Sequence, residues 1–156
     1  MKEKLKLAPV SVEWQASAYG INIEGAEADT LVAGTIVKLA DGMQKRVSIS
    51  FPSFAEIRFF NFNFGEHHYN EYEIKGPDGN FLEDAFDWKQ FDPLFQEKGI
   101  CPNPYFYEVV NTTWFEEKDL YKPLAARGFK HFLLVGYDSY LEILALDDIR
   151  YSLEDA

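Results

Sequence analysis

Residues 35–51, TIVKLADGMQKRVSISF, decide the kind of fold this chain adopts. Apolar and polar side chains alternate over Arg46–Phe51, and Asp41-Gly42 separates this run from a second strand-like run, Thr35–Leu39. Alternation with a period of two places one face of a strand on a core and the other face in water, as in antiparallel sheets. An Asp-Gly pair between two such runs is a strong hairpin signal. The sequence therefore predicts two antiparallel strands joined by a tight turn.

Strand patterns continue on both sides of this hairpin. Asp138-Ser139 separates two further apolar runs and predicts a second hairpin. Pro52-Ser53 is expected to bulge or break the strand that follows the first hairpin, because proline cannot donate to a ladder. The expected strands outside the first hairpin are Val10–Ala16, Tyr19–Ile23, Phe54–Phe64, Tyr105–Val110, His131–Tyr137, Tyr140–Leu146 and Ile149–Leu153.

Two short helices are expected in the second half of the chain. Asp92 is placed to cap a helix with Pro93 at its first position and Gly99 beyond its end. Thr113 and Glu116 have the spacing of a capping box, so a second helix is expected to start at Trp114. Proline interrupts helices, so Pro123 is expected to end or kink this one.

The length and composition favour one α+β domain that is mainly antiparallel β. The 156 residues fit a single domain covering positions 1–156, and the hydrophobic share of 47% argues against disorder. We find no internal repeat and no linker of low complexity. The predicted architecture is a twisted antiparallel sheet or a β-sandwich with one or two short helices.

The charge excludes some partners and favours others. The formal net charge is −11, whereas nucleic acids and anionic membranes attract positive proteins. We expect neither as a partner, and instead expect a basic protein. Cys101 is the only cysteine, and MKEKLKLAPV at the start carries no apolar segment of a signal peptide. The expected compartment is the cytoplasm, and exposed strand edges make a homodimer plausible.

Residues 81–97, FLEDAFDWKQFDPLFQE, give the main functional hint. They combine five aromatic residues, five acids and one base. One interpretation is a crossover loop whose rings pack on the sheet while its acids face water. The other is an acidic, aromatic recognition surface, because protein interfaces use aromatic anchors with a charged rim. The predicted partner-binding residues are Glu83, Asp84, Asp87, Trp88 and Asp92, which Tyr69, Tyr72, Tyr105, Phe106 and Tyr107 could extend.

Metal binding and catalysis have weaker candidates. His67, His68 and Glu71 are metal-ligand types, and the run after Gly65 loosely resembles the metal motif of cupin barrels, although it lacks the His-x-His pattern. His131 would be a general base only if Glu142 on the neighbouring strand faced it. No phosphate loop, nucleophile elbow, HExxH or Cys-x-x-Cys is present. We predict no cofactor, and the balance favours a protein without catalytic activity while leaving motif-free enzymes open.

The overall character resembles that of bacterial immunity proteins. Such proteins are small, cytosolic and acidic, and they neutralise a cognate toxin by covering its basic active site. The resemblance implies a non-enzymatic protein-binding domain that meets a basic toxin through its acidic aromatic surface. The alternative is a β-domain, either non-catalytic or hydrolytic, that binds a carbohydrate or another small ligand, with aromatic rings stacked on sugars and carboxylates bonded to hydroxyls.

Overall fold

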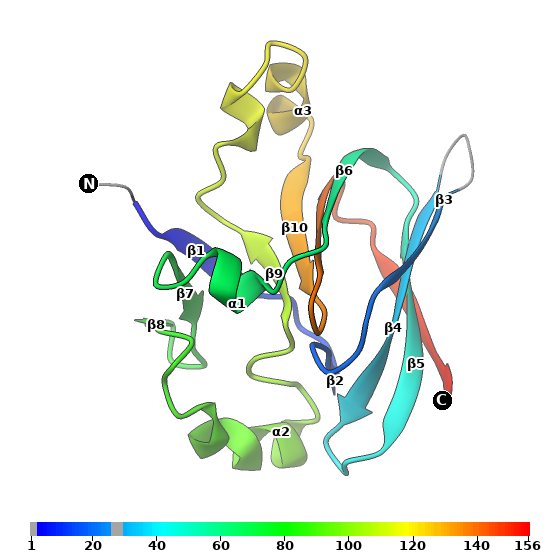
Figure 1. Ribbon diagram of the computed structural model, residues 1–156, viewed down its shortest axis with the longest axis vertical. Helices are drawn as coiled ribbons and strands as arrows, with labels where there is room; N and C mark the ends of the chain where they lie inside the picture. Colours follow the sequence, from blue (N-terminus) through cyan, green and yellow to red (C-terminus); the bar gives the residue numbers. More distant parts are fainter. Residues whose placement is uncertain (1–2, 26–29) are drawn as a thin grey trace.

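The computed structural model describes residues 3–25 and 30–156, and its strands form two sheets (Figure 1). The seven-stranded sheet has the order β6-β11-β10-β9-β1-β7-β8, and the five-stranded sheet joins β12-β5-β4-β2, with β3 also paired to β4. The strands are β1 (Leu5–Pro9), β2 (Trp14–Gln15), β3 (Asn22–Gly25), β4 (Leu31–Leu39), β5 (Gln44–Phe51), β6 (Phe54–Phe60), β7 (Tyr72–Lys75), β8 (Phe81–Leu82), β9 (Phe106–Val109), β10 (Lys130–Val135), β11 (Tyr140–Ala145) and β12 (Arg150–Asp155).

The two predicted hairpins are confirmed. β4 and β5 pair antiparallel, with Thr35 opposite Val47, and Gly42 adopts a φ of 86° in the turn between them. β10 and β11 also pair antiparallel around Asp138-Ser139. The α+β, mainly antiparallel architecture expected from the sequence is therefore the observed one.

Pro52-Ser53 carries the chain from one sheet to the other. β5 belongs to the five-stranded sheet, whereas β6 forms one edge of the seven-stranded sheet. Proline cannot donate to a ladder, so this dipeptide suits a break between two sheets. The return crossing, from β11 to β12, passes beside it, because the Leu146 backbone N–H donates to the Ser53 carbonyl at 2.9 Å.

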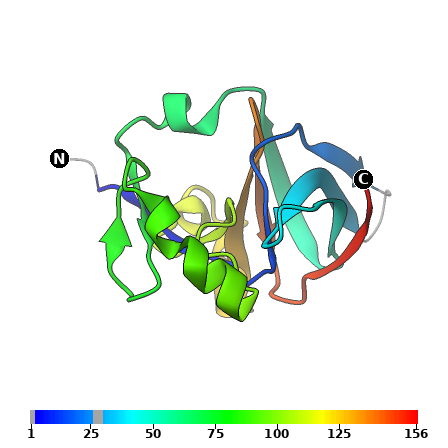
Figure 2. The ribbon, with the colours of Figure 1, turned by 90° about the horizontal axis from the view of Figure 1, so that it is seen from below.

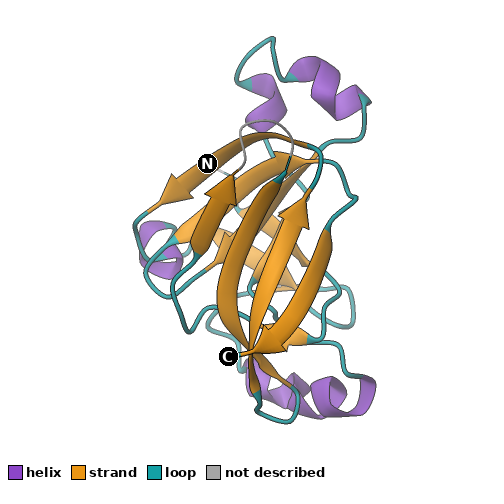
Figure 3. Cartoon of the chain, turned by 90° about the vertical axis from the view of Figure 1, so that its right-hand side faces the viewer, coloured by secondary structure: helices purple, strands orange, loops and turns teal. Residues whose placement is uncertain are grey.

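The two sheets enclose a common core. Every second residue of β4 and β5 is buried, and these side chains pack against the inward-facing residues of β9, β10 and β11. Figure 3 shows the five-stranded sheet from its outer side, with helical segments above and below it in that view. The members of this inner core include Val12, Trp14, Ala33, Val37, Val47, Ile49, Phe51, Phe106, Phe132, Leu134, Leu141 and Ile143.

The outer face of the seven-stranded sheet is also covered. Leu133 and Val135 of β10 alternate with inward-facing Phe132 and Leu134, and they pack in a second cluster with Phe64, Ile74 and other residues. A strand buried on both faces explains the unbroken apolar run of β10. Figure 2 shows β7, β8 and α2 on the opposite side of β10 from the five-stranded sheet.

One pairing departs from the predicted antiparallel pattern. β1 pairs in parallel with β7, with Lys6 opposite Glu73, and it pairs antiparallel with β9. Neither β1 nor β7 was predicted from the sequence. Both are short, and their partners are far away in the chain, so no local turn signals the pairing.

The helices differ in detail from the prediction. α2 (Asp92–Lys98) is present and ends at Gly99, but Asp92 is its first residue and the N-cap is Phe91. A helical segment does start at Trp114, with Thr113 as its N-cap, but it is only the short 3-10 helix η2 (Trp114–Glu116). The expectation that Pro123 ends or kinks this helix is wrong, because Pro123 lies in the first turn of a separate helix, α3 (Lys122–Ala126). Proline is favoured in a first turn because its missing N–H would have no helical partner there.

Three expected strands differ from their predicted extent. Of Tyr19–Ile23, only Asn22 and Ile23 belong to a strand, β3, which continues to Gly25. Of Val10–Ala16, only Trp14–Gln15 pairs in a ladder, although Val12, Trp14 and Ala16 are buried as the alternation implied. The strand from Phe54 ends at Phe60. Asn63 then caps the short helix α1 (Phe64–His67), because its side-chain oxygen accepts from the Glu66 backbone N–H at 3.0 Å.

Among residues 3–25 and 30–156, no helix combines the length and the apolar character needed to cross a membrane.

Candidate functional site

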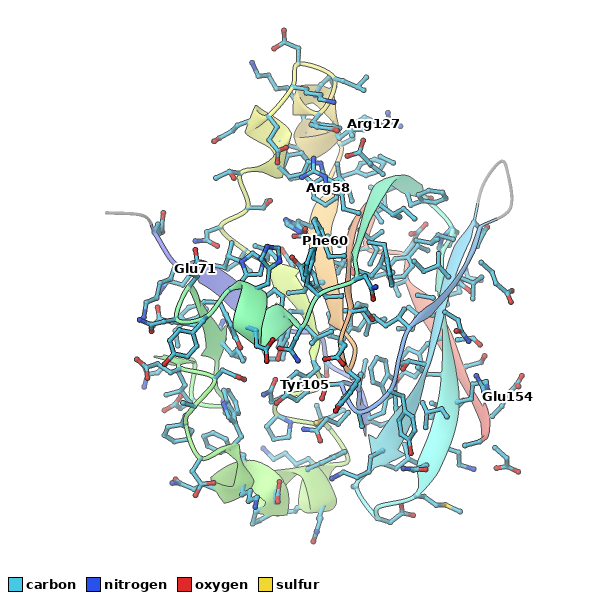
Figure 4. All side chains as sticks on the ribbon, in the orientation of Figure 1. Arg58, Phe60, Glu71, Tyr105, Arg127 and Glu154 are labelled. Carbon is cyan, nitrogen blue, oxygen red and sulfur yellow. The ribbon has the colours of Figure 1, made fainter. Side chains whose placement is uncertain are left out.

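A hollow of about 230 Å³ opens at one end of the outer face of the seven-stranded sheet. We call it the tyrosine hollow, because four tyrosines line it. Their rings come from separate parts of the chain: β7, the residue before β9, β9 itself and the β10–β11 turn. Figure 4 labels Tyr105 in the middle of the molecule, below α1. The tyrosines are Tyr72, Tyr105, Tyr107 and Tyr137, and Phe64, Ser17, Asn63 and Asp84 are further lining residues.

A second hollow of about 190 Å³ adjoins the first. The two share Gly65, Tyr72 and Asp84 in their linings. Tyr69 and Glu83 also line this adjoining hollow. Asp84 therefore stands between the two depressions and is accessible from both.

Residues with a strained backbone conformation lie in the linings of the two hollows. In the described part of the chain, the only non-glycine residues with positive φ are Ser17 at 85°, Asn70 at 59° and Tyr105 at 59°. Ser17 and Tyr105 line the tyrosine hollow, and Asn70 lines the adjoining one. Such conformations cost on the order of 1–3 kcal/mol each and gather at functional sites. Their placement therefore marks this region as a candidate site.

The strained backbone at Tyr105 is held from both sides. The Ala16 N–H donates to the Pro104 carbonyl and the Val135 N–H donates to the Tyr105 carbonyl, each at 2.9 Å. The Tyr107 hydroxyl donates to Asn103 Oδ1, and Asn103 is almost fully buried. These contacts fix the segment that enters β9, so the rings of Tyr105 and Tyr107 have set positions in the wall of the hollow.

Asp84 is the only charged side chain in the lining of the tyrosine hollow, as far as the structure describes the chain. Burial, followed by the nearby Asp84 carboxylate, raises the pKa of Tyr105 to about 12. Burial also raises the pKa of Tyr72 and of Tyr107 well above its ordinary value. The three phenols are therefore neutral at physiological pH, and the negative charge of the hollow comes from Asp84.

Two exposed aromatic rings, Tyr69 and Tyr137, line the hollows, and a third, Phe62, directly precedes the lining residue Asn63 in the chain. Phe62 is 59% exposed, Tyr69 81% and Tyr137 62%. Asn63 connects the α1 side to the β10–β11 turn, because its Nδ2 donates to the Tyr137 carbonyl at 3.1 Å. We define the pocket face as the exposed aromatic and acidic residues of the two linings, Tyr69, Glu83, Asp84 and Tyr137, together with Phe62 and Asp138, which adjoin the lining residues Asn63 and Tyr137 in the chain.

The five residues predicted to bind a partner are divided between two places. Glu83 and Asp84 lie at the hollows of the pocket face. Trp88 and Asp92 line a third hollow of about 250 Å³, together with Lys38 and Lys89. Asp87 caps the 3-10 turn η1 (Trp88–Phe91) by accepting from the Lys89 N–H at 3.3 Å.

Trp88 is the ring of the 81–97 segment that packs against the outer core cluster. Phe86, Trp88 and Phe91 contact one another, with centroid distances of 5.6–6.1 Å, and Phe95 is buried. Glu83, Asp84 and Asp92 remain exposed. The segment thus packs as a crossover with its acids exposed, and its role as a recognition surface stays a prediction.

The candidate metal ligands share a hydroxyl group. The Tyr140 hydroxyl lies 2.6 Å from His67 Nδ1 and 3.1 Å from His68 Nε2, so it can donate to one imidazole and accept from the other. Glu71 follows α1, and its carbonyl accepts from the Leu5 N–H at 2.8 Å. Within the described residues, no three His, Cys, Asp or Glu side chains are grouped to hold a metal ion.

Glu142 does face His131, as a general base would require. His131 Nε2 lies 2.7 Å from Glu142 Oε1, and its Nδ1 lies 2.7 Å from the Thr112 hydroxyl. That hydroxyl also accepts from the Trp114 N–H at 3.1 Å, and His131 is only 7% exposed. The arrangement ties the loop before η2 to the sheet, which is a structural role.

Cys101 is expected to be unreactive in the folded protein. Burial raises the pKa of its thiol to about 12, partly offset by the Asn103 backbone N–H, and the residue is 3% exposed. Because the thiolate is the reactive form, reaction with DTNB at pH 8 should be slow in native protein and fast in urea. The native rate should keep rising with pH beyond about 9, where an ordinary cysteine levels off. Fast native reaction at pH 8 would contradict this environment.

Sequence reasoning found part of this site. Tyr69, Tyr72, Tyr105 and Tyr107 were named as extensions of the acidic surface and do line the hollows, whereas Phe106 points into the inner core. Ser17, Phe62, Asn63 and Tyr137 were missed. The one available signal was an aromatic residue directly before the predicted Asp138-Ser139 turn.

Comparisons with protein-family models, curated proteins and solved structures find no match to this chain.

Proposed function

We propose that this chain is a non-enzymatic binding protein whose pocket face recognises a basic partner protein. The observation that carries the proposal is the convergence of two exposed aromatic rings, Tyr69 and Tyr137, and two carboxylates, Glu83 and Asp84, on two adjoining hollows. Protein interfaces are built around such aromatic anchors. The net charge of −11 would attract a basic partner over a long range and accelerate encounter.

The specific role we propose is that of an immunity-type protein, which neutralises a toxin by covering its basic active site. This role needs a surface that binds, and no chemistry of its own. The lining of the tyrosine hollow contains no histidine, lysine or cysteine within the described residues. A nucleophile with an adjacent base is therefore not assembled there. A single cysteine fits a reducing compartment, and we propose the cytoplasm.

The experiment compares three tagged proteins in capture from the native source's lysate at low and moderate salt. The face variant, Glu83→Gln with Asp138→Asn, removes two charges beside the hollows while leaving Asp84 in place. The control, Glu97→Gln with Glu154→Gln, removes two charges from α2 and β12, and Glu154 lies on the five-stranded sheet (Figure 4). Mass spectrometry identifies and quantifies the captured proteins.

We expect one dominant basic protein, bound by the wild type and by the control. The face variant should retain about fivefold less of it, and salt should weaken the wild-type complex more than the variant complex, because rim charges act through screened attraction. Equal capture by all three proteins would contradict the proposed face.

A carbohydrate is the second candidate ligand, favoured by the tyrosine lining of the hollows. Hydrolysis is disfavoured, since glycoside cleavage uses two carboxylates across a cleft and the described lining of the tyrosine hollow has one, Asp84. A thermal-shift screen with a sugar panel distinguishes this candidate. A saturable shift that is unaffected by salt would favour the sugar over the basic partner.

A further inference from the structure

We propose that the tyrosine hollow receives one arginine side chain of the partner, with its guanidinium group against Asp84. This inference rests on the proposed function, because it names the group that the pocket face takes from a basic protein. It makes Asp84 the specificity-determining residue of the interface, and the other carboxylates of the face contribute attraction without a defined contact.

The first argument is charge. Asp84 is exposed and lines both hollows. In residues 3–25 and 30–156, no lysine or arginine forms an ion pair with Asp84, whereas Glu73, Asp147 and Asp155 each have a lysine partner. The Asp84 carboxylate acts on Tyr72, Tyr105 and Tyr107, raising the pKa of each, so its field extends through the hollow. A cation entering the hollow meets this field with no resident base to compete.

The second argument is the aromatic wall. Tyr72, Tyr105, Tyr107 and Tyr137 surround the space beside Asp84. Aromatic rings attract cations through their negative faces, and aromatic cages bind cationic groups in many proteins. The phenols stay neutral at physiological pH, so they act as rings and hydroxyl acceptors, and Asp84 supplies the full charge.

The third argument is size. The tyrosine hollow measures about 230 Å³. This is below the range of about 300–1,000 Å³ that is typical of pockets for drug-sized ligands. It suits a single side chain inserted from a protein surface. The positive φ of Ser17 and Tyr105 fixes two of its walls, which favours a preformed receptor for one inserted group.

Arginine fits this combination better than lysine. Its planar guanidinium stacks on aromatic rings and can donate two parallel bonds to one carboxylate, whereas the ammonium of lysine is a compact, strongly hydrated point charge. A hollow with several rings and one carboxylate matches the planar fork. We therefore assign the occupant to an arginine on the partner's surface, and a free small cation becomes an outcome of the test.

The test uses two probes that differ in charge but have nearly the same shape. Nα-acetyl-arginine amide carries the guanidinium, and Nα-acetyl-citrulline amide replaces it with a neutral urea. Each is titrated into the ¹⁵N-labelled full chain, and the backbone amide resonances of Gly65, Gly136 and Tyr137 are followed. The variants are Asp84→Asn and, as a matched control three residues away, Asp87→Asn, which lies outside the lining of the hollow.

We expect the arginine probe to shift these resonances with half-saturation on the order of 10 mM, a plausible strength for one isolated side chain. The citrulline probe should cause no saturable shift. Asp84→Asn should weaken the binding of the arginine probe about tenfold, and Asp87→Asn should leave its affinity unchanged. The same two variants are then compared in the capture experiment, where Asp84→Asn should lower the amount of basic partner captured more than Asp87→Asn does.

Two results would overturn the inference. If neither probe shifts these resonances while the partner is still captured through the pocket face, the hollow takes no arginine and the proposed function survives. If the arginine probe binds but Asp84→Asn leaves partner capture unchanged, the hollow is a site for a free cation and takes no side chain of the partner. Failure of the proposed function itself would appear separately, as equal capture by the wild type and the Glu83→Gln, Asp138→Asn variant.

Discussion

Replacing Phe106 by alanine is expected to lower the free energy of unfolding by about 3–5 kcal/mol. Phe106 is fully buried between the two sheets. Its ring stacks on Trp14 at a centroid distance of 5.8 Å and also contacts Phe51 and Phe132, at 6.3 and 6.2 Å. The substitution removes apolar contacts to both sheets and leaves a cavity that these large rings cannot readily fill.

Urea denaturation followed by tryptophan fluorescence measures this loss. Phe59→Ala is the matched control, because Phe59 lies in the same sheet, on β6, and is 44% exposed. We expect the control to change stability by less than about 1 kcal/mol, as surface substitutions usually do. Similar losses for the two variants would show that the space between the sheets is not the main core.

The Phe106 substitution also tests how the core supports the candidate site. Tyr105 and Tyr107, on either side of Phe106, line the tyrosine hollow. Successive side chains of a strand point to opposite faces, so β9 carries the inner core on one face and the wall of the hollow on the other. A shift of β9 into the cavity would move both tyrosine rings. Partial loss of partner binding by folded Phe106→Ala protein is therefore consistent with the proposed site.

The parts of the fold that the sequence revealed are those with local signals. Asp41-Gly42 and Asp138-Ser139 each join strands that are neighbours in both chain and sheet, so turn chemistry and alternation were sufficient. The parallel pair of β1 and β7 joins Leu5 to Tyr72 and has no turn between them. A pairing of that kind depends on the packing of the whole chain, and neither short strand contains a sequence signal that predicts it.

The candidate site, like the fold, was predicted only where a short stretch of sequence carried a signal. Asp84 was found because the 81–97 segment is unusual in composition, and Tyr105 and Tyr107 because the chain is aromatic there. The positive φ of Ser17 has no counterpart in residue type, since glycine or asparagine is the usual sign of that conformation. The hollow forms only when six separate segments meet, so its existence could not be deduced from any one of them.

The helical region after β9 was predicted least well, and the reason is visible in the packing. The capping-box spacing from Thr113 to Glu116 favoured a continuous helix from Trp114. The structure instead turns the chain after Glu116, so that the rings of Trp114 and Tyr121 pack together with Leu144 of β11. Burial of two large aromatic rings outweighs the weak preference for one more helical turn.

Replacing Trp114 by alanine is the second change with a large expected effect. Trp114 is 1% exposed and contacts His131 edge-on at 4.8 Å, while the Arg58 guanidinium lies 4.1 Å from its ring. Figure 4 shows Arg58 beneath the segment that carries α3. We expect a loss of about 3–5 kcal/mol in the free energy of unfolding, because the substitution removes the centre of the third cluster.

This loss should be accompanied by local opening of the segment around α3. Limited trypsin digestion of the folded Trp114→Ala protein should cleave after Lys118 and Arg127 well before other sites, because Tyr121 is then the one buried side chain left between residues 112 and 129. Leu120→Ala is the control within the same segment, since Leu120 is 75% exposed, and it should keep wild-type stability and digestion. Equal early cleavage in the two variants would mean that Trp114 is not the residue that keeps the segment closed, and that the ion pair of Arg58 with Glu117, which is intact in both variants, does not hold it either. If the Trp114→Ala protein resisted trypsin as well as the wild type does but still lost about 3–5 kcal/mol of stability, the segment and the two sheets would unfold as one unit.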